Sequence, residues 1–362
     1  MRIKKRVLVA MSGGVDSAVA AYLLKKKGYE VIGLTMCFGL PDAKGKRPNC
    51  CGISGVEDAK RVSEQLGISH YAISFGKMLK EKVIDEFLKE YVCGRTPNPC
   101  IRCNQYLKFD ALIKEAKKLS CDFLATGHYA RIIKNIKGQF FLKRAKDLKR
   151  DQSYFLFRIP SKQMDFILFP LGGYTKEQVR AIAGENKLPV ADKPASQDIC
   201  FIPDGELKDF LKERLDEKLF KPGLIKDTKG NILGQHKGIV FYTVGQRQGL
   251  GIAYKYALYV AAIDSKNNTL VVGDKKEAYR NKLEASQLHL LALNKLPKKL
   301  EVKAQIRYNH PQAKAVIYPV DEDRIRVEFN QPQWAVTPGQ SVVFYQRDIV
   351  VGGATIEKVI EN

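Results

Sequence analysis

Hydrophobic and polar positions follow two alternating periods along the first half of the chain. Short apolar runs rich in β-branched residues are typical of buried parallel strands, and they occur at 6–10, 30–35, 71–73 and 122–126. Between and after them, apolar residues repeat at helical spacing over 18–24, 55–67, 77–91, 105–119, 175–187 and 206–219. This alternation predicts an α/β fold with a doubly wound parallel sheet, which binds its ligand at the carboxyl ends of the strands.

The pattern changes beyond Pro222, where segments rich in Gly, Thr, Val and Tyr take over, as in 238–244. Short alternating runs separated by turns follow at 302–306, 315–318, 325–329, 341–345 and 349–351. Such runs predict a small β-barrel. We therefore expect an α/β domain over 1–205, a small central domain over 206–280 and a C-terminal β-barrel domain over 281–362.

The segment Ser12-Gly13-Gly14-Val15-Asp16-Ser17 follows the first strand and opens the first helix, as a pyrophosphate-binding loop does. Glycines let the backbone approach an anion, and a helix N-terminus offers unpaired N–H groups. Asp16 would hold Mg²⁺ or orient the loop. No Gly-Lys-Ser/Thr follows, so this is not a Walker A motif, and a ligand-free tight turn is the alternative. The string resembles the signature of the ATP-pyrophosphatase (PP-loop) family, whose members cleave ATP between the α and β phosphates and adenylylate a substrate.

Charge favours a polyanionic partner. The formal net charge is +22, and residues 1–205 carry +15 of it, densest over 131–150. This concentration in the domain of the nucleotide loop favours RNA over a merely solvated lysine-rich surface. No apolar run reaches membrane-spanning length, and the N-terminal residues lead directly into the first strand. We expect a cytoplasmic protein with no membrane partner, in which the eight cysteines do not form a structural disulfide framework.

Three cysteines stand in polar, turn-rich surroundings. Cys100 and Cys103 form a CxxC pair after two prolines, and Cys200 lies in a loop that runs into an apolar segment. We expect the pair at the start of a helix that begins near residues 104–105, where the helix dipole and Arg95 or Arg102 would lower the thiol pKa. A lone CxxC fits a redox pair, half a zinc site or packing, but a four-cysteine zinc ribbon within one chain needs a second CxxC.

We expect structural roles for the other five cysteines. Cys37, Cys93 and Cys121 lie in apolar contexts and are expected in the core, and a structural role is expected for Cys50 and Cys51.

Three further sequence motifs follow the PP-loop string and the CxxC pair along the chain. Thr126-Gly127-His128-Tyr129 ends a predicted strand and therefore lies on the nucleotide side of the sheet. The string 150–156, which begins Arg-Asp-Gln, closes the basic stretch. The glycine-rich string 243–251 matches no dinucleotide-binding pattern and is interpreted as a loop that contacts RNA.

These five motifs, in this order, resemble the tRNA-specific 2-thiouridylases (MnmA/TrmU family) of the PP-loop superfamily, whose fold is adenine nucleotide alpha hydrolase-like. The resemblance extends over nearly the whole chain, to the turn at 338–341. It implies a PP-loop domain, a small central domain and a C-terminal β-barrel. It also implies a sulfurtransferase that converts ATP to AMP and pyrophosphate. Such an enzyme adenylylates the C2 oxygen of wobble uridine 34 in the tRNAs for Lys, Glu and Gln, and then replaces that oxygen with sulfur.

The resemblance also assigns residues. It implies an ATP site, with Mg²⁺, lined by Ala10, Met11, Ser12, Gly13, Gly14, Val15, Asp16, Ser17, Met36 and Gly127. It implies contacts with the flipped target base by Asn98, Pro99 and Cys100, and tRNA contacts by His128, Arg150, Asp151, Gln152, Arg307, Tyr308 and Gln340.

Two sulfur chemistries stay open. In the first, Cys200 receives a persulfide from a cysteine desulfurase or sulfur-relay protein, and Cys103 releases the product and closes a transient Cys103–Cys200 disulfide. Many family members have an acid–base Asp where this chain has Cys100, which weakens that scheme. In the second, Cys100, Cys103 and Cys200 hold a [4Fe–4S] cluster whose open iron binds free sulfide, as in cluster-dependent tRNA thiolases.

Two other classes of protein are alternatives. A small-molecule PP-loop ligase, such as an argininosuccinate- or NAD-synthetase-like enzyme, needs neither the three cysteines nor the basic stretch. A non-catalytic RNA-binding protein would bind tRNA equally well after changes to Asp16 or the cysteines.

Overall fold

The computed structural model describes residues 4–39, 53–194, 199–202 and 206–360. The chain forms two compact units. Unit 1 consists of Met1–Val83, Pro99–Gly205 and Asp348–Val350, and unit 2 of Ile84–Asn98, Glu206–Arg347 and Val351–Asn362. The predicted central domain and barrel both lie in unit 2. The domain boundaries at 205 and 280 stay predictions.

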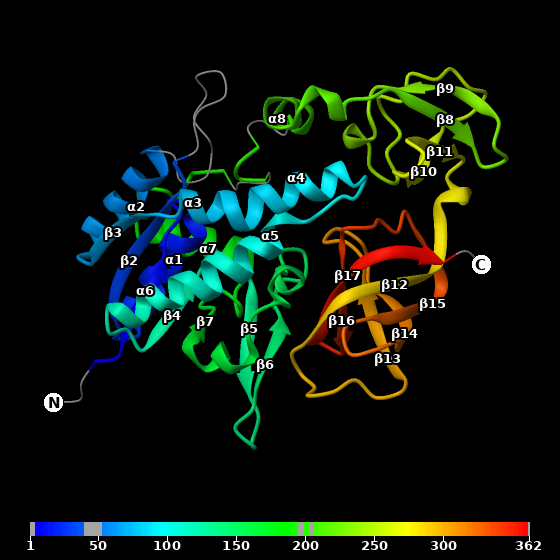
Figure 1. Ribbon diagram of the computed structural model, residues 1–362. Coiled ribbons are helices and arrows are strands. Elements are labelled where there is room, and N and C mark those ends of the chain that lie inside the picture. The colour runs from blue at the N-terminus through cyan, green and yellow to red at the C-terminus, as the bar shows by residue number, and fades with distance from the viewer. Residues whose placement is uncertain (1–3, 40–52, 195–198, 203–205, 361–362) are drawn as a thin grey trace. The chain divides into compact units, whose positions relative to one another are not determined.

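Unit 1 is built on a parallel sheet with the strand order β3-β2-β1-β4-β7 (Figure 1). Its strands are β1 (Arg6–Ala10), β2 (Glu30–Cys37), β3 (Ser69–Ser74), β4 (Phe123–Thr126) and β7 (Ile167–Leu168). The chain runs outward from β1 to β3 and then returns to β4 on the other side of β1. Because the order reverses between β1 and β4, the crevice at their carboxyl ends is the expected ligand site of a doubly wound sheet. The predicted fold of this part is confirmed.

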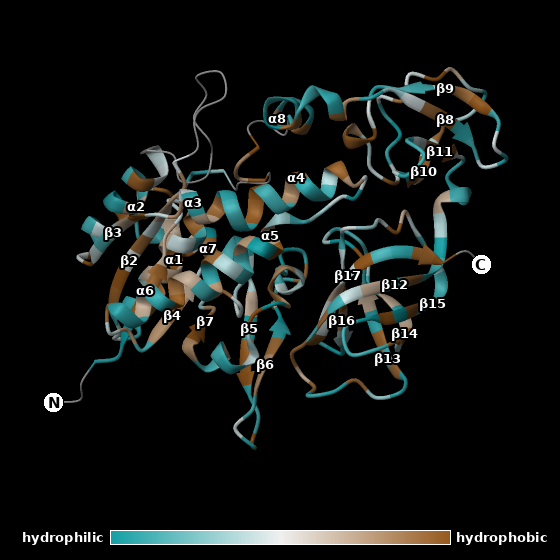
Figure 2. Ribbon diagram, viewed as in Figure 1, coloured by the Kyte–Doolittle hydropathy of each residue, from teal (hydrophilic) through white to brown (hydrophobic). Residues whose placement is uncertain are grey.

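Helices cover the sheet of unit 1. They are α1 (Val15–Lys26), α2 (Ile53–Leu66), α3 (Gly76–Leu79), α5 (Pro99–Arg102), the π-helix η2 (Cys103–Ala111), α6 (Leu112–Lys118) and α7 (Lys176–Glu185), with 3₁₀ turns η3 (Ser153–Leu156) and η4 (Ser161–Phe166). Helix α1 packs on α2 and α7 as well as on the sheet, so eight of its twelve residues are buried. Figure 2 colours α1 and the central strands largely as apolar, which agrees with the burial of their side chains in the core.

Two predicted helices differ from the structure. The segment expected over 77–91 is divided into α3, the π-turn η1 (Lys80–Ile84) and α4 (Asp85–Val92). The helix expected over 105–119 begins earlier, with α5 at Pro99. Proline favours the first helical position because its φ is already helical and its missing N–H costs no hydrogen bond there. The predicted helix start near residues 104–105 is therefore wrong, whereas the CxxC pair does lie at the start of the helix, with Cys100 in its first turn.

The basic stretch forms a hairpin that the sequence pattern did not predict. Strands β5 (Ala130–Lys134) and β6 (Phe140–Arg144) pair in antiparallel register. The Asn135 side chain closes the turn by accepting hydrogen bonds from the backbone N–H groups of Lys137 and Gln139, both at 2.9 Å. Lysine and arginine interrupt the apolar alternation of these strands, which is why periodicity missed them.

Unit 2 contains a four-stranded sheet with the order β10-β11-β8-β9. The strands are β8 (Gly223–Asp227), β9 (Ile232–His236), β10 (Tyr259–Asp264) and β11 (Thr269–Gly273). The apolar 238–244 segment contains the 3₁₀ turn η7 (Ile239–Phe241), which buries Ile239 and Val240. The helix expected over 206–219 is shorter, with α8 (Leu207–Arg214) followed by the 3₁₀ turn η6 (Glu217–Leu219).

The C-terminal part of unit 2 is a closed barrel of six strands. They are β12 (Tyr279–Leu290), β13 (Leu300–Gln305), β14 (Ala313–Pro319), β15 (Ile325–Trp334), β16 (Ser341–Gln346) and β17 (Ile349–Ile360), and the barrel closes by pairing β12 with β17. The five strands predicted from alternation are confirmed, and β12 was missed. Burial alternates along β15, where Ile325, Val327 and Phe329 point into the core.

Among the helices that the structure describes, none combines the length and the apolar character that a membrane span requires.

Candidate active site

The PP-loop lies at the strand-order reversal, between the end of β1 and the start of α1. Ser17 organises it: its Oγ donates to the Gly14 carbonyl at 3.0 Å and accepts from the Ser12 backbone N–H at 3.2 Å. Gly14 is the N-cap of α1, and no side chain caps it. The first N–H groups of this twelve-residue helix are therefore directed at the loop, as an anion site requires.

Two glycines are required by close backbone contacts. Gly13 has a φ of +71°, and a Cβ there would lie 2.3 Å from the Gly55 carbonyl oxygen. Gly127 follows β4, and a Cβ there would lie 2.9 Å from backbone atoms of both Asp16 and Ser17. The end of β4 is thus packed against the first turn of α1, where no side chain fits.

Two residues that the sequence analysis did not identify hold the Asp16 carboxylate. Lys176 Nζ lies 2.6 Å from Asp16 Oδ1, and the Tyr129 hydroxyl donates to the same oxygen at 2.7 Å. The Lys176 side chain is 9% exposed, so this ion pair is well shielded. Burial, followed by the charge of Asp16, raises the pKa of Tyr129 far above its ordinary value, so the phenol stays protonated. Both contacts use Oδ1, and neither uses Oδ2.

A second lysine braces the loop from the other side. Lys193 Nζ donates to the Gly13 carbonyl at 3.1 Å and to Asp58 Oδ2 at 2.6 Å. Burial opposes ionisation of Asp58, but the hydrogen bonds from Lys193 and Arg61 outweigh it and lower the pKa of this carboxyl. Lys193 lies 180 residues from Gly13, so spacing in the sequence carried no signal for it.

A cavity of about 280 Å³ opens in unit 1 beside the loop. Its lining contains most of the predicted site: Ala10, Met11, Ser12, Asp16, Ser17, Met36, Pro99, Cys100, Cys103, Gly127, His128, Gln152 and Cys200. The lining also contains Thr126, from the predicted motif at 126–129, and residues that the sequence did not suggest: Leu34, Phe38, Leu79, Lys108, Ile199 and Phe201. The PP-loop motif and all three candidate catalytic cysteines therefore meet in one cavity.

The cysteines outside the cavity differ in how far their side chains are buried. Cys121 is buried, as expected of a core residue, and burial raises the pKa of its thiol to about 11. Cys37 is half-buried, and burial raises the pKa of its thiol as well. Cys93 is exposed, so its predicted core position is wrong. It is the C-cap residue of α4, beyond the apolar face of that helix. Cys50 and Cys51 lie outside the described residues.

The cationic groups expected near the CxxC pair are engaged elsewhere. Arg95, in unit 2, pairs with Glu90 at 2.7 Å and with Glu357 at 2.6 Å. Arg102 Nη1 donates to Gln105 Oε1 at 3.1 Å. Two carboxylates neutralise the charge of Arg95, and the expectation that Arg95 or Arg102 lowers the thiol pKa stays a prediction.

Two metal groups were expected from the sequence, a [4Fe–4S] cluster and Mg²⁺, and the positions of possible ligand side chains bear on both. Within the described parts of the chain, no group of three or more His, Cys, Asp or Glu side chains is arranged to hold a metal ion. Cys100, Cys103 and Cys200 line the same cavity, and a [4Fe–4S] cluster held by them stays a prediction. Asp16 is the one acidic side chain in the described lining, and Mg²⁺ bound to nucleotide phosphates often needs only one or two protein carboxylates.

His128 is fitted into the cavity wall. Its Nδ1 lies 2.7 Å from Thr126 Oγ1, and its ring packs against Phe109 and Phe169 at centroid distances of 5.9 and 6.0 Å. Burial lowers the pKa of His128 well below its ordinary value, and the charge of Lys108 lowers it further. The imidazole is therefore neutral near pH 7.

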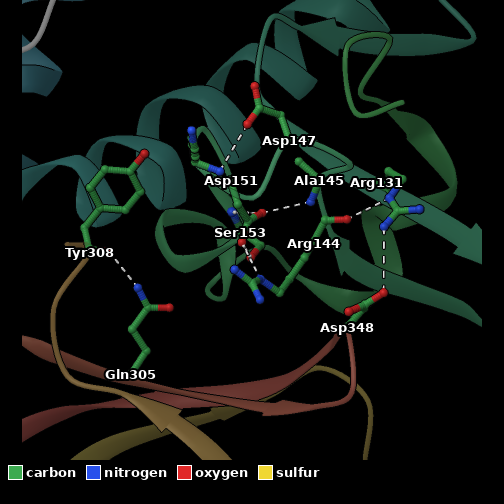
Figure 3. A network of polar contacts seen from close by, with 10 residues as sticks. Arg131, Arg144, Ala145, Asp147, Asp151, Ser153, Gln305, Tyr308 and Asp348 are labelled. Atoms are coloured by element: carbon green, nitrogen blue, oxygen red, sulfur yellow. Dashed lines mark hydrogen bonds and ion pairs between the residues drawn. The ribbon is translucent and has the colours of Figure 1, made fainter. Parts of the chain in front are cut away.

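The Arg150-Asp151-Gln152 string contains three different environments. Asp151 is buried and accepts hydrogen bonds from Arg144 Nε, the Ala145 N–H and the Ser153 hydroxyl, each at 2.9 Å (Figure 3). Gln152 joins the cavity to Tyr129 through two hydrogen bonds, at 2.8 and 2.9 Å. Arg150 is exposed. The geometry makes Asp151 a structural anchor for this segment.

The predicted RNA-contacting residues of the barrel lie in unit 2. Arg307 stacks over the Trp334 ring at 5.2 Å and donates to the Trp334 carbonyl at 3.0 Å. The Tyr308 carbonyl accepts from Gln305 Nε2 at 2.7 Å, as Figure 3 shows. Gln340 Nε2 donates to the Thr96 carbonyl at 2.7 Å. These contacts define the orientation of Arg307 and Gln340 without a ligand.

Comparison with family models divides the chain into three matched segments. A tRNA methyl transferase HUP domain matches residues 5–204, and a tRNA methyl transferase PRC-barrel domain matches 208–274. An aminomethyltransferase β-barrel domain matches 280–356.

Full-length relatives are similar over their whole length. The tRNA-specific 2-thiouridylase MnmA of Acetivibrio thermocellus is 49% identical over 359 residues, which covers 98% of this chain and 99% of the relative. The tRNA-specific 2-thiouridylase MnmA 2 of Thermoanaerobacter sp. (strain X514) is 47% identical over 365 residues, with all of both chains covered. The MnmA of Carboxydothermus hydrogenoformans is 48% identical over 359 residues, with 98% of each chain covered.

Proposed function

Because the chain belongs to the tRNA-specific 2-thiouridylase (MnmA) family, we propose that it is an ATP-dependent tRNA-uridine 2-sulfurtransferase. The observation that carries this proposal is the single cavity in which the PP-loop meets Cys100, Cys103 and Cys200. A reaction that first activates an oxygen with ATP and then replaces it with sulfur needs both sets of groups within reach of one base. The product would be 2-thiouridine at wobble position 34.

The PP-loop side of the cavity suits the adenylylation step. The uracil C2 oxygen is a poor leaving group, so it attacks the α-phosphorus of ATP, and pyrophosphate departs toward the N–H groups at the start of α1. Ser12 lines the cavity there and offers a hydroxyl donor, while the Ser17 hydroxyl holds the loop by donating to the Gly14 carbonyl. Asp16 would hold Mg²⁺, which offsets phosphate charge, and the Lys176 and Tyr129 contacts keep its carboxylate in place.

The cysteine side suits the sulfur step. A persulfide on Cys200, supplied by a cysteine desulfurase or sulfur-relay protein, attacks C2 with its terminal sulfur, and AMP leaves with the former O2. The base is then joined to Cys200 through a disulfide. The Cys103 thiolate attacks the Cys200 sulfur, which releases the 2-thio base and forms a Cys103–Cys200 disulfide. A thiol reductant restores both cysteines. Among the described residues no metal-binding group of side chains is formed, and no step here uses a [4Fe–4S] cluster.

Cys100 occupies the position where many family members have an acid–base Asp. Its place in the first turn of α5, in the lining of the cavity, supports a role beside the target base. Pro99 also lines the cavity, and both residues would meet the base after it leaves the anticodon stack.

Basic and aromatic surfaces of each unit support RNA as the substrate. In unit 1, the β5–β6 hairpin carries Lys134 and Lys137, and Arg150 is exposed beyond it. In unit 2, Tyr254 and Tyr256 are exposed and lie edge to face at 4.9 Å, with Lys255 between them in the chain. Exposed aromatic rings beside cations are suited to stacking on unpaired bases. We propose that Arg307, Tyr308 and Gln340 also contact the tRNA, with the Lys, Glu and Gln isoacceptors as substrates.

The test is nucleoside mass spectrometry of tRNA incubated with the purified protein, ATP and a persulfide donor. The proposal expects 2-thiouridine that depends on ATP and on the donor. Turnover of ATP and pyrophosphate without tRNA would favour a small-molecule ligase instead. A methylated nucleoside formed with a methyl donor would support the chemistry that the family-model descriptions print and would contradict the proposal. Binding of tRNA without any modified product would favour a non-catalytic RNA-binding protein.

A further inference from the structure

Lys108 is the one cation in the described lining of the active-site cavity, and no motif in the sequence pointed to it. It lies on the π-helix η2, which begins at Cys103. No carboxylate among the described residues pairs with it in an ion pair. Its charge nevertheless reaches His128, since it contributes to lowering the pKa of that residue.

The π-helix explains how Lys108 reaches the cavity. In an α-helix, residues five positions apart lie about 140° apart around the axis, so Cys103 and Lys108 would face different neighbours. The wider turn of a π-helix, with i→i+5 hydrogen bonding, brings residue i+5 back toward the side of residue i. Both residues accordingly line the same cavity.

Phe109 anchors this irregular turn. Its φ and ψ are −108° and 15°, outside the helical range, and its side chain is fully buried. The ring packs against His128 and Phe169. A buried aromatic ring at the kink therefore fixes the backbone next to Lys108, as expected of a π-bulge at a functional site.

The positive charge of Lys108 is not balanced by the carboxylate in the described lining of the cavity. The described part of the lining has one carboxylate, Asp16, and Lys176 already neutralises it at 2.6 Å. The second lysine of the loop, Lys193, is neutralised by Asp58. Among the described lining residues, Lys108 therefore carries a positive charge that no carboxylate balances, on the π-helix that also carries Cys103 and beside His128. An anion is the complementary ligand.

Resting on the function proposed above, we infer that Lys108 binds the α-phosphoryl group of the nucleotide, in ATP and in the AMP that leaves C2. This group passes from the pyrophosphate at the PP-loop to the base oxygen near the cysteines. It must therefore lie between the two sides of the cavity. The neutral imidazole of His128 adds no competing charge there. A charge-assisted hydrogen bond from the ammonium would hold the phosphoryl group while pyrophosphate, and later AMP, departs.

The test measures the affinity of the full-length protein for AMP and for adenosine by calorimetry. The two ligands differ only in the phosphoryl group. Lys108→Met should weaken AMP binding roughly 10- to 100-fold, as expected for loss of a hydrogen bond from a charged group, and leave adenosine binding unchanged. Lys108→Arg should retain most of the AMP affinity. Lys114→Met is the matched control, because Lys114 lies one helix later, is exposed and pairs with Asp110 at 2.9 Å; it should change neither affinity.

Added salt should weaken AMP binding to the parent protein more than binding to Lys108→Met, because the variant lacks the charge that salt screens. Equal losses of AMP and adenosine affinity in Lys108→Met would mean that Lys108 has a structural role, and unchanged AMP affinity would remove it from the site. Either result overturns the inference. If the parent protein still forms 2-thiouridine in that case, the proposed function stands, so the two failures are distinguishable.

Discussion

The two sides of the cavity in unit 1 are built in different ways. The loop side consists of the contiguous residues Ser12–Ser17 at the strand-order reversal, with Gly127 packed against them, and it is held by backbone contacts that only glycine permits. The cysteine side, with Cys100, Cys103, Lys108 and Cys200, combines a proline-initiated helix, a π-helix and a chain segment almost one hundred residues away. The loop side has a geometry common to many ATP-using enzymes. We infer that the cysteine side is what makes the chemistry specific.

The largest expected effect separates the two sides directly. Cys103→Ser should lower 2-thiouridine formation by about 10³-fold or more, because the base stays joined to Cys200 through a disulfide. Denaturing gels should show a tRNA–protein adduct that dithiothreitol releases. Cys200→Ser should abolish both product and adduct, and the exposed Cys93→Ser is the control that should change neither. Product formation by Cys200→Ser at the parent rate would contradict the persulfide scheme.

A smaller but still large effect is expected on the loop side. Gly13→Ala places a Cβ against the Gly55 carbonyl and requires a positive φ, so we expect a loss of about 1–3 kcal/mol in stability together with the loss of ATP binding. Thermal unfolding and ATP titration measure the two effects. Gly184→Ala, where a Cβ meets no atom within 4 Å in the interior of α7, is the control and should be neutral or stabilising. An intact ATP affinity in Gly13→Ala would show that the loop does not hold the nucleotide.

Lys176→Met tests, on the loop side, the ion pair with Asp16 separately from the backbone of the PP-loop. It leaves the PP-loop backbone unchanged but removes the buried ammonium that pairs with Asp16. We expect roughly a 10- to 100-fold loss in kcat/KM for ATP, because a mispositioned carboxylate no longer supports the phosphates. The Cys103→Ser adduct should still form in the double variant, only more slowly. An unchanged kcat/KM would mean that Tyr129 alone holds Asp16.

The smallest effect concerns unit 2 and should leave the cavity untouched. Burial opposes ionisation of Glu357, but hydrogen bonds from Arg95 and Ser286 outweigh it, so the pKa of Glu357 is lowered in the folded state. A depressed folded pKa contributes stability above the unfolded pKa of about 4.3, and this contribution is lost as the pH falls through the folded value. Glu357→Gln should therefore flatten the acid limb of the stability–pH curve, measured by denaturant unfolding. A curve parallel to that of the parent protein would exclude this ion pair as a source of acid sensitivity.

The sequence was most informative where function depends on local backbone geometry. Strand β1, the glycine turn and α1 are adjacent in the chain, so their pattern identified both the fold and the loop. The five alternating runs of the barrel were equally clear, because alternate burial needs only a period of two.

The sequence was least informative where distant residues meet. Lys176 and Lys193 lie 160 and 180 residues from the loop atoms that they contact, so no spacing rule reveals them. The helix start at Pro99 was missed because the proline pair was interpreted as a turn. The π-helix was missed because it interrupts the 3.6-residue period that identifies helices, and with it the position of Lys108. Asp151 matched an RNA-contacting position, but its burial among backbone donors was not visible from residue type.

The central claim is that the C2 oxygen of the target uridine is activated by ATP on one side of the cavity and replaced from the other. The most direct measurement uses tRNA whose target uridine carries ¹⁸O at O2, followed by mass spectrometry of the AMP released during thiolation. The account predicts AMP that contains one ¹⁸O for each 2-thiouridine formed, since the oxygen leaves bound to phosphorus. AMP without ¹⁸O, together with normal 2-thiouridine formation, would contradict it.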